Sequence, residues 1–307
     1  MLKGIFLAAV AVMRITEISK TFEGVVGVDA FDIDTGQRIT FHSNESFPMG
    51  SVYKVPIAIA LLQRVDRGEV KLDDKATFGP DDFHPGWSPL AEEAKGNPIT
   101  LTVGELLDRM LRDSDNSACD YILAHYATPK EVMKTLRAMR VTNVDVSRPE
   151  AMMVGQMLRE GDVIVTRAHY AERAKTISAT DAGLGIQTYW RDPRDSATPA
   201  GINDLFVKIY KHQVGLKSES EERLLKPLRE TLTGLDRIKA GIPGDARIIH
   251  KTGSMPGTSN DAAIVTSADG KHHIVIVVFT KWSRGSEEDR AKVIAAMAKA
   301  AYEGLTQ

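Results

Sequence analysis

The sequence predicts an α/β protein in which strands from both ends of the chain form one sheet and a helical segment is inserted between them. Residues 24–43 alternate apolar and polar side chains around the turn Asp34-Thr35-Gly36-Gln37, which is typical of a β-hairpin. Residues 246–253, 260–268 and 271–281 are predicted as three more strands, with Asp269-Gly270 as the turn between the last two. Most of the chain between these two groups has helical spacing.

The two ends of the chain are each predicted to form a helix. Residues 10–22 have an apolar inner side, and residues 287–305 form an amphipathic pattern. The apolar run Gly4–Met13 follows Lys3 and is similar to the end of a secretory signal, although it is short for one. A misassigned start codon and a plain first helix are the alternatives.

The inserted segment is predicted to begin with a helix over residues 51–66. A polar stretch over residues 71–98 follows, and a strong helical pattern begins at Thr102. Capping boxes at the pairs Thr102/Glu105 and Thr128/Glu131 mark two helix starts. Residues 143–198 are the least regular part: a charged helix-like piece is expected at 159–173 and a loop at 183–199, after which helices resume.

Composition excludes several classes of protein. The chain has 307 residues, 43% hydrophobic and 26% charged, which is ordinary for a globular protein. A net charge of -2 gives no reason to expect nucleic acid or an anionic membrane as a partner. The single cysteine, Cys119, cannot form an intramolecular disulfide and is expected to be a buried thiol.

Three short motifs carry the chemistry, and they occur in a fixed order. Ser51 and Lys54 form an S-x-x-K tetrad at a helix start, where residues three apart share a face. Ser114-Asp115-Asn116 lies between two helical stretches, and Lys251-Thr252-Gly253-Ser254 ends a predicted strand. A lysine beside a serine can make the hydroxyl nucleophilic without a histidine. Together the trio is the signature of serine penicillin-recognising enzymes.

The wider sequence resembles the class A serine β-lactamases over residues 10–305. FPMGSVYK is similar to the nucleophile segment of that family, and Trp87-Ser88-Pro89 stands where the family has an aromatic gate. KTGSMPGTSNDAAI is similar to the third motif and the strand after it, and RDSATP to the end of the Ω-loop. The resemblance implies a β-lactamase/DD-peptidase fold with a monomeric chain and no cofactor.

This resemblance implies a particular arrangement of domains. A five-stranded antiparallel sheet, flanked by the N- and C-terminal helices, is expected from residues 1–50 and 236–307. An all-helical subdomain is expected from residues 51–235, including an enlarged Ω-loop at about 146–198. The active site would lie between the two parts.

The residue types suggest how an acyl-enzyme would form. Ser51 Oγ would attack a lactam carbonyl, and Lys54 can accept its proton. Ser114 can pass a proton to the leaving nitrogen, with Lys251 polarising the Ser114 hydroxyl. The resemblance further implies an oxyanion hole made by the backbone N–H groups of Ser51 and Ser254, where one donor is worth about 3–4 kcal/mol.

Other motif residues are expected to bind the substrate. Asn116 offers an amide to the carbonyl of the substrate side chain, and Asp115 supports the loop. The hydroxyls of Thr252 and Ser254 suit a substrate carboxylate, and Gly253 lies between them. Trp87 is expected to gate the site. Ser117 is expected to be a structural hydroxyl. No metal is expected, because none of the eight histidines forms a pair with metal-ligand spacing.

Breakdown of the acyl-enzyme is where the sequence departs from the family pattern. The resemblance assigns Glu150 as the deacylation base, with Asp181 as the fallback. It also predicts a salt bridge between Arg148 and Asp195 that closes the Ω-loop, with roughly thirty extra residues between them. Val154 stands where the family has a water-holding asparagine, which puts efficient hydrolysis in doubt.

A second departure concerns a cation near the substrate carboxylate. The arginine often found on the strand after the third motif is absent, since Ser259-Asn260-Asp261 stands there. Lys281, Arg284 and Arg290 are the candidates that the sequence offers for this charge.

The resulting hypothesis is a serine hydrolase that opens a small-molecule β-lactam through an acyl-enzyme at Ser51. A D-alanyl-D-alanine carboxypeptidase or esterase with the same machinery is the alternative enzyme. A penicillin-binding sensor or pseudo-enzyme, which stays acylated or merely binds, is the non-enzyme alternative. A periplasmic or secreted location is expected, because lactams and peptidoglycan are met outside the cytoplasm.

Overall fold

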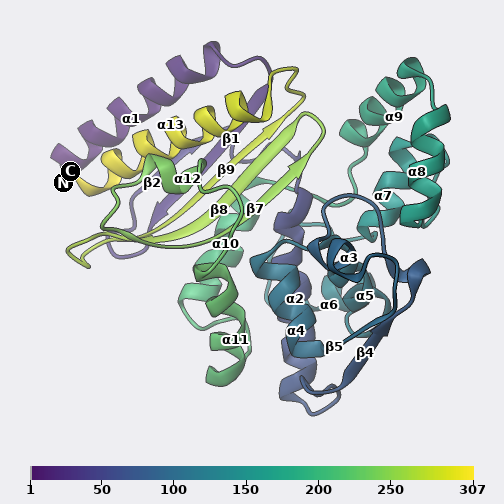
Figure 1. Ribbon diagram of the computed structural model, residues 1–307. Coiled ribbons are helices and arrows are strands. Elements are labelled where there is room, and N and C mark those ends of the chain that lie inside the picture. Colours follow the sequence, from purple (N-terminus) through teal and green to yellow (C-terminus); the bar gives the residue numbers. More distant parts are fainter. Residues whose placement is uncertain (1) are drawn as a thin grey trace.

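A five-stranded antiparallel sheet forms the centre of one half of the molecule (Figure 1). The structure is a computed structural model that describes residues 2–307, with side chains described from residue 6 onward. The strand order is β2-β1-β9-β8-β7. The strands are β1 (Val25–Asp32), β2 (Arg38–Phe41), β7 (Arg247–Met255), β8 (Thr258–Thr266) and β9 (His273–Lys281). The predicted fold class, the N-terminal hairpin and the three C-terminal strands are confirmed.

The sheet is buried on both faces, and strand β9 shows why. Its side chains alternate between two separate apolar clusters, since neighbouring residues in a strand point to opposite faces. Val275, Val277 and Phe279 pack toward the helical half of the molecule. Ile274, Ile276 and Val278 pack beneath the terminal helices. The unbroken apolar run of this strand therefore serves two cores at once.

The terminal helices α1 (Leu2–Lys20) and α13 (Glu287–Thr306) cover one face of the sheet (Figure 1). Helix α1 begins earlier than the predicted residue 10 and includes the apolar run Gly4–Met13. The two helices approach closely at Gly304, where a Cβ atom would lie 2.5 Å from the Ala11 side chain. Among the described residues, no helix combines the length and apolar character that a membrane span requires.

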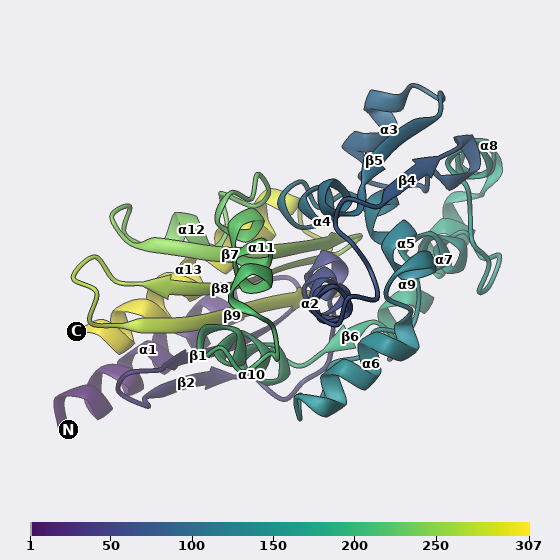
Figure 2. The same cartoon turned by 90° about the horizontal axis from the view of Figure 1, so that it is seen from below.

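The other half of the molecule is mainly helical, and helix α2 (Lys54–Asp66) lies between it and the sheet (Figure 2). Both predicted capping boxes are present at helix starts. Cys119 is buried as expected, and burial raises the pKa of its thiol. The helices here are α3 (Pro89–Ala94), α4 (Val103–Arg112), α5 (Asn116–His125), α6 (Pro129–Ala138), α7 (Glu150–Met157), α8 (Arg167–Thr176) and α9 (Ala179–Arg191).

The remaining elements connect the two halves. Helix α10 packs against β1 and β9, and α11 contacts both α2 and β7. Two small antiparallel ribbons pair β3 with β6 and β4 with β5. The bounds are β3 (Phe47–Pro48), β4 (Lys75–Phe78), β5 (Ile99–Thr102), β6 (Ser196–Ala197), α10 (Pro199–Tyr210), α11 (Ser218–Arg229), α12 (Ile238–Gly241) and the 3₁₀ turns η1 (Gly50–Tyr53) and η2 (Pro80–Asp82). The exact limits of the two predicted subdomains stay a prediction.

The predicted loop over residues 183–199 is wrong, because helix α9 continues to Arg191. Glycines at 183 and 185 weaken the helical signal in the sequence. At Gly185 the reason for the glycine is packing: a Cβ atom would lie 1.9 Å from the Met157 carbonyl oxygen. The glycine therefore lets α9 pack directly on the end of α7, a tertiary contact that local propensity does not report.

Candidate active site

The turn that carries Ser51 is pressed against strand β7. Gly50 has a φ of +51°, and a Cβ atom there would lie 2.9 Å from Ser254 N. On the opposite side, a Cβ at Gly253 would lie 2.2 Å from the Met49 carbonyl oxygen. Both glycines are required for this approach. It brings the backbone around Ser51 and Ser254 side by side, as the predicted oxyanion hole requires.

Lys54 lies one turn beyond Ser51 and is completely buried. Its Nζ atom donates to Ser51 Oγ at 3.0 Å, to the Ser114 carbonyl oxygen at 2.8 Å and to Asn116 Oδ1 at 2.6 Å. An ammonium group has three N–H donors, so these bonds use its full capacity. The first two motifs are thus joined through one amine.

The Ser114 turn has a strained backbone that its neighbours hold in place. Ser114 has a φ of 61°, a left-handed conformation that costs a non-glycine residue of order 1–3 kcal/mol. Asp115 begins helix α5 by accepting from Ala118 N at 2.9 Å, and it also accepts from Ser88 Oγ at 3.0 Å. The Ser117 hydroxyl accepts from Ser88 as well. Asp115 and Ser117 therefore have the structural roles predicted for them.

Lys251 approaches the same serine from the sheet. Its Nζ atom donates to Ser114 Oγ at 2.8 Å and to the Thr252 carbonyl oxygen at 3.0 Å. Burial lowers the pKa of Lys251 well below its ordinary value, and the nearby cationic Lys54 lowers it further. The structure thus brings all three motifs together around Ser51. Lys54 lies on one side of Ser114 and Lys251 on the other.

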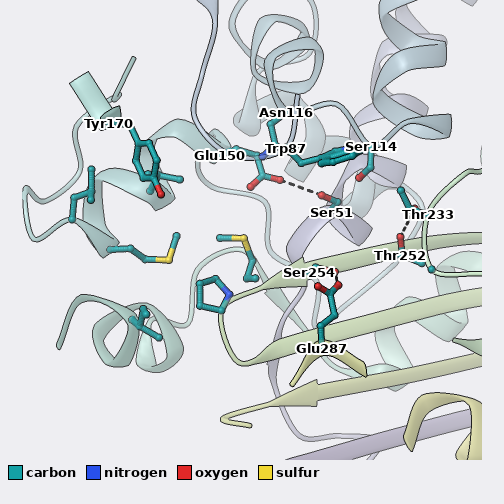
Figure 3. A pocket seen from close by; sticks show the side chains of 18 of the residues that line it. Ser51, Trp87, Ser114, Asn116, Glu150, Tyr170, Thr233, Thr252, Ser254 and Glu287 are labelled. Atoms are coloured by element: carbon teal, nitrogen blue, oxygen red, sulfur yellow. Dashed lines mark hydrogen bonds between the residues drawn. The ribbon is translucent and has the colours of Figure 1, made fainter. Parts of the chain in front are cut away.

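Glu150 stands at the start of α7 and faces the nucleophile (Figure 3). Its Oε1 atom accepts from Ser51 Oγ at 3.4 Å and lies 3.5 Å from Lys54 Nζ. The side chain is only 2% exposed, and burial raises the pKa of its carboxyl group. The fallback candidate Asp181 is engaged elsewhere, accepting from Ser178 at the start of α9. Glu150 is therefore the carboxylate beside Ser51.

Asp120 supports Glu150 and was not predicted as part of the site. Its buried carboxylate accepts from Glu150 N at 2.7 Å and Ala151 N at 2.9 Å, and it lies 2.8 Å from His84 Nδ1. A carboxylate at the first turn of a helix is also favoured by the helix dipole. The sequence signal was available, since Asp120 lies one helical turn beyond Asn116.

The predicted salt bridge that closes the Ω-loop is present and buried. Arg148 Nε donates to Asp195 Oδ2 at 2.7 Å, and both side chains are 2% exposed. The second carboxylate oxygen of Asp195 accepts from the backbone N–H groups of Ser147 and Arg148. Arg148 also pairs with Asp192 at 3.0 Å. The two ends of the long segment are therefore joined, while α8 and α9 lie between them.

The cation near the third motif is Arg237, which the sequence analysis missed. Its Nη2 atom donates to Ser254 Oγ at 2.6 Å and to Glu287 Oε1 at 2.9 Å. Its Nη1 atom donates to the carbonyl oxygens of Gly253 and Asn260. Arg237 lies in the irregular stretch before α12, where no local pattern marks it.

The predicted sources of this charge are wrong, since two of the three are bound elsewhere. Lys281 donates to the Ser46 carbonyl oxygen, and Arg290 to Ser259 Oγ and the Gly285 carbonyl oxygen. Arg284 is exposed. None of them lines the cavity beside Ser254.

Trp87 lies at the rim of the cavity that contains Ser51 (Figure 3). Its indole Nε1 donates to the Asp113 carbonyl oxygen at 2.7 Å, while the side chain as a whole is 63% exposed. Thr252 lies deeper and its hydroxyl is 2.6 Å from that of Thr233. Seven of the ten residues predicted for catalysis and substrate binding line this cavity, and Lys54, Lys251 and Gly253 do not. Lys54 and Lys251 contact it through their bonds to Ser51 and Ser114.

The cavity has a volume of about 760 Å³ and extends from Ser51 to the inserted helices. Its Ser51 end is polar, and its far end is lined by apolar side chains of α7, α8 and α9. Within the described residues, no group of three or more histidine, cysteine or acidic side chains is arranged to hold a metal ion.

Comparison with known proteins identifies the family. The family model described as the Beta-lactamase enzyme family matches residues 11–305. Beta-lactamase VEB-1 of Pseudomonas aeruginosa is 28% identical over 94% of this chain and 87% of its own length. The carbapenem-hydrolyzing beta-lactamase KPC of Klebsiella oxytoca is 27% identical with the same coverage.

Solved structures agree with the sequence comparison. A beta-lactamase from Chitinophaga pinensis superimposes with a TM-score of 0.75 and 29% identity, covering 94% of this chain and 97% of that one. An ancestral class A beta-lactamase gives a TM-score of 0.76 and 28% identity over 95% and 99% of the two chains. The chain therefore belongs to the class A β-lactamase family.

Proposed function

We propose that the protein hydrolyses β-lactams through a covalent acyl-enzyme on Ser51. The observation that carries this proposal is that two groups lie within hydrogen-bond distance of Ser51 Oγ. They are Lys54 Nζ, at 3.0 Å, and the buried carboxylate of Glu150, at 3.4 Å. A nucleophile with a basic group on each side can be both acylated and deacylated. The relatives named as β-lactamases support the same reaction class.

Acylation begins with removal of the Ser51 proton. Because all three N–H donors of a charged Lys54 are in use, this amine must first give a proton away. Glu150 Oε1, 3.5 Å from Lys54 Nζ, is the acceptor, and its raised pKa favours holding a proton. Neutral Lys54 then takes the serine proton as Oγ bonds to the lactam carbonyl carbon.

Opening of the ring requires a proton on the leaving nitrogen. Ser114 Oγ donates this proton and is resupplied by Lys251, whose ammonium lies 2.8 Å away. The lowered pKa of Lys251 makes it a better proton donor than an exposed lysine. The negative charge on the carbonyl oxygen is stabilised by the N–H groups of Ser51 and Ser254, each worth about 3–4 kcal/mol.

The substrate carboxylate binds at the third motif. Thr252, Ser254 and Arg237 supply hydroxyl and guanidinium donors along one wall of the cavity. Glu287 accepts from both Ser254 and Arg237, so an incoming carboxylate competes with it for these donors. Since Glu287 is 63% exposed on its side chain, displacing it toward solvent costs little.

Hydrolysis of the ester requires a water molecule activated by Glu150. Before this, the proton that Glu150 took from Lys54 passes to Lys251, which lost one to the leaving nitrogen through Ser114. Ionised Glu150 then accepts a proton from the water as it attacks the acyl carbon, and the Ser51 oxygen leaves with a proton from Lys54. Val154, which lines the cavity next to Glu150, offers no amide to hold this water. Deacylation is therefore the slower half of the reaction. Encounter with lactams would occur outside the cytoplasm, and we propose export on this ground.

One experiment tests the proposal against the alternatives. The protein is mixed with a chromogenic cephalosporin, and both the absorbance and the intact mass are followed. Steady hydrolysis through a transient adduct on Ser51 is expected. A stoichiometric burst with a lasting adduct would indicate a D-alanyl-D-alanine peptidase or a sensor, and no adduct would overturn the proposal.

A further inference from the structure

The two inserted helices direct several apolar side chains at the cavity, although Tyr189 of α9 packs into the main core. On α8, Tyr170 and Ala174 lie four residues apart on one helical face, and both line the cavity. Ile177, the residue that follows the helix, lines it as well. On α9, Ala182 and Ile186 do the same. Helix α8 has no fully buried side chain anywhere along its length. Its apolar stripe is thus left facing the space that leads to Ser51.

Helix α7 continues this apolar wall to the catalytic centre. Val154, Met157 and Leu158 line the cavity between Glu150 and the two inserted helices. The charged side chains that line the cavity are Glu150, Arg237 and Glu287, and the last two are bonded to Ser254 at the polar end. We call the far end, lined by α7, α8 and α9, the apolar chamber (Figure 3).

The segment that carries α8 and α9 is hydrogen-bonded to the rest of the protein at both of its ends. At one end, Arg167 N donates to the Phe83 carbonyl oxygen at 2.9 Å. At the other end, Trp190 Nε1 donates to the Pro256 carbonyl oxygen at 2.7 Å, in the turn that follows the third motif. Gly257 makes room for this contact, since a Cβ there would lie 2.3 Å from the Trp190 ring. The helices therefore span the cleft.

We infer that the apolar chamber binds an extended apolar acyl group, alkyl or aryl, of the substrate that acylates Ser51. This rests on the proposed function, because the acyl group occupies the chamber only when its carbonyl carbon is at Ser51 Oγ. The replacement of a family asparagine by Val154 fits this use, as it removes a polar group where the chamber meets Glu150. Burial of a methylene stabilises a complex enough to raise kcat/KM about threefold.

The test is a series of 6-acylaminopenicillanic acids that differ only in a straight acyl chain: acetyl, butyryl, hexanoyl and octanoyl. For the unaltered protein we expect kcat/KM to rise about threefold per added methylene. A flat series would overturn the inference. Intact mass identifies a different failure: if even the acetyl compound leaves no adduct on Ser51, the proposed function itself is wrong.

Variants on helix α9 provide a matched pair. Ile186→Asp puts a charge into the apolar chamber and should reduce the dependence to about 1.5-fold per methylene or less. Leu184→Asp places the same charge two residues away on the solvent side, where Leu184 is 41% exposed, and should keep the full dependence. An equal dependence in both variants would contradict the inference.

The variant Ala182→Trp provides an independent test in case Ile186→Asp does not fold. Ala182→Trp adds bulk without charge and should lower kcat/KM for octanoyl more than for acetyl, so that the series flattens or reverses. The thermal unfolding curve of each variant serves as the control for folding. A steep chain-length dependence in a folded Ala182→Trp protein would overturn the assignment of the chamber.

Discussion

The two halves of the active site are built in different ways. Around Ser51, Lys54, Ser114 and Lys251, hydrogen bonds of 3.0 Å or less join a helix, a turn and a strand of the main fold. Glu150 approaches from the side, on a segment whose middle carries two helices with little core of their own. In the proposed reaction, the acyl-enzyme therefore forms at a centre fixed by short hydrogen bonds, while its breakdown depends on a segment with few buried contacts.

The Ser51 helix and the segment that carries Glu150 should respond differently to mutation. The Ser51 helix is buried in the main apolar cluster, so disturbing it should unfold the protein. Of residues 150–195, Met153 and Tyr189 reach the main apolar cluster, and the other buried apolar contacts centre on a small separate cluster of Val154, Leu158 and Val165. Segments with few buried contacts open with low free energy. Changes there should alter deacylation before they alter the fold.

The largest expected effect comes from removing the nucleophile. Ser51→Ala should lower kcat with a chromogenic cephalosporin by about 10⁴-fold or more, because both half-reactions pass through this oxygen. Intact mass should show no adduct at any time. An adduct on the variant would mean that another residue is the nucleophile.

The substitution Glu150→Gln should separate acylation from deacylation. We expect deacylation to slow by about 10²–10⁴-fold, since the base is lost while the shape is kept. The acyl-enzyme should then accumulate on Ser51 and be visible by mass. Because Glu150 also receives a proton from Lys54 in our scheme, acylation should fall as well, though less than deacylation. Normal turnover in this variant would show that the base is elsewhere.

The pH dependence should report the ionisation of Glu150 in the unaltered protein, because in our scheme both half-reactions begin with this carboxylate ionised. Burial raises the pKa of Glu150, and this group must be ionised to activate water. Deacylation should therefore fall about tenfold per pH unit below that raised pKa, at a higher pH than an ordinary glutamate would give. Pre-steady-state measurements of the deacylation rate constant between pH 4 and 8 check this. An acid limb at the pKa of an exposed glutamate would contradict it.

The smallest effect is expected from Asp120, which contacts Glu150 through its backbone N–H and not through its carboxylate. Asp120→Ala leaves the N–H groups of Glu150 and Ala151 without their buried acceptor. We expect the free energy of unfolding to fall by about 1–3 kcal/mol and deacylation to slow by about tenfold. Acylation should hardly change. The control is Asp108→Ala on helix α4, whose carboxylate is 34% exposed, pairs with Arg223 and does not line the cavity.

Much of the fold was predictable because its signals are local. The hairpin turns, the capping boxes and the strand β9 are each specified by residues close together in the sequence. The segment over residues 143–198 was not, since Gly185 serves a contact with Met157 that lies outside its own helix. Arg237 was missed for the same reason: its role depends on Ser254 and Glu287, seventeen and fifty residues away.

The sequence by itself determined the family and identified the candidate nucleophile, the two lysines and the serine between them, because the three motifs are short and ordered. Only the tertiary structure decided which carboxylate faces Ser51, what holds it and which cation serves the third motif. It also showed that the long insertion turns an apolar wall toward the nucleophile. These properties arise from contacts between distant segments, and the free energy that maintains them depends on packing that no single segment encodes.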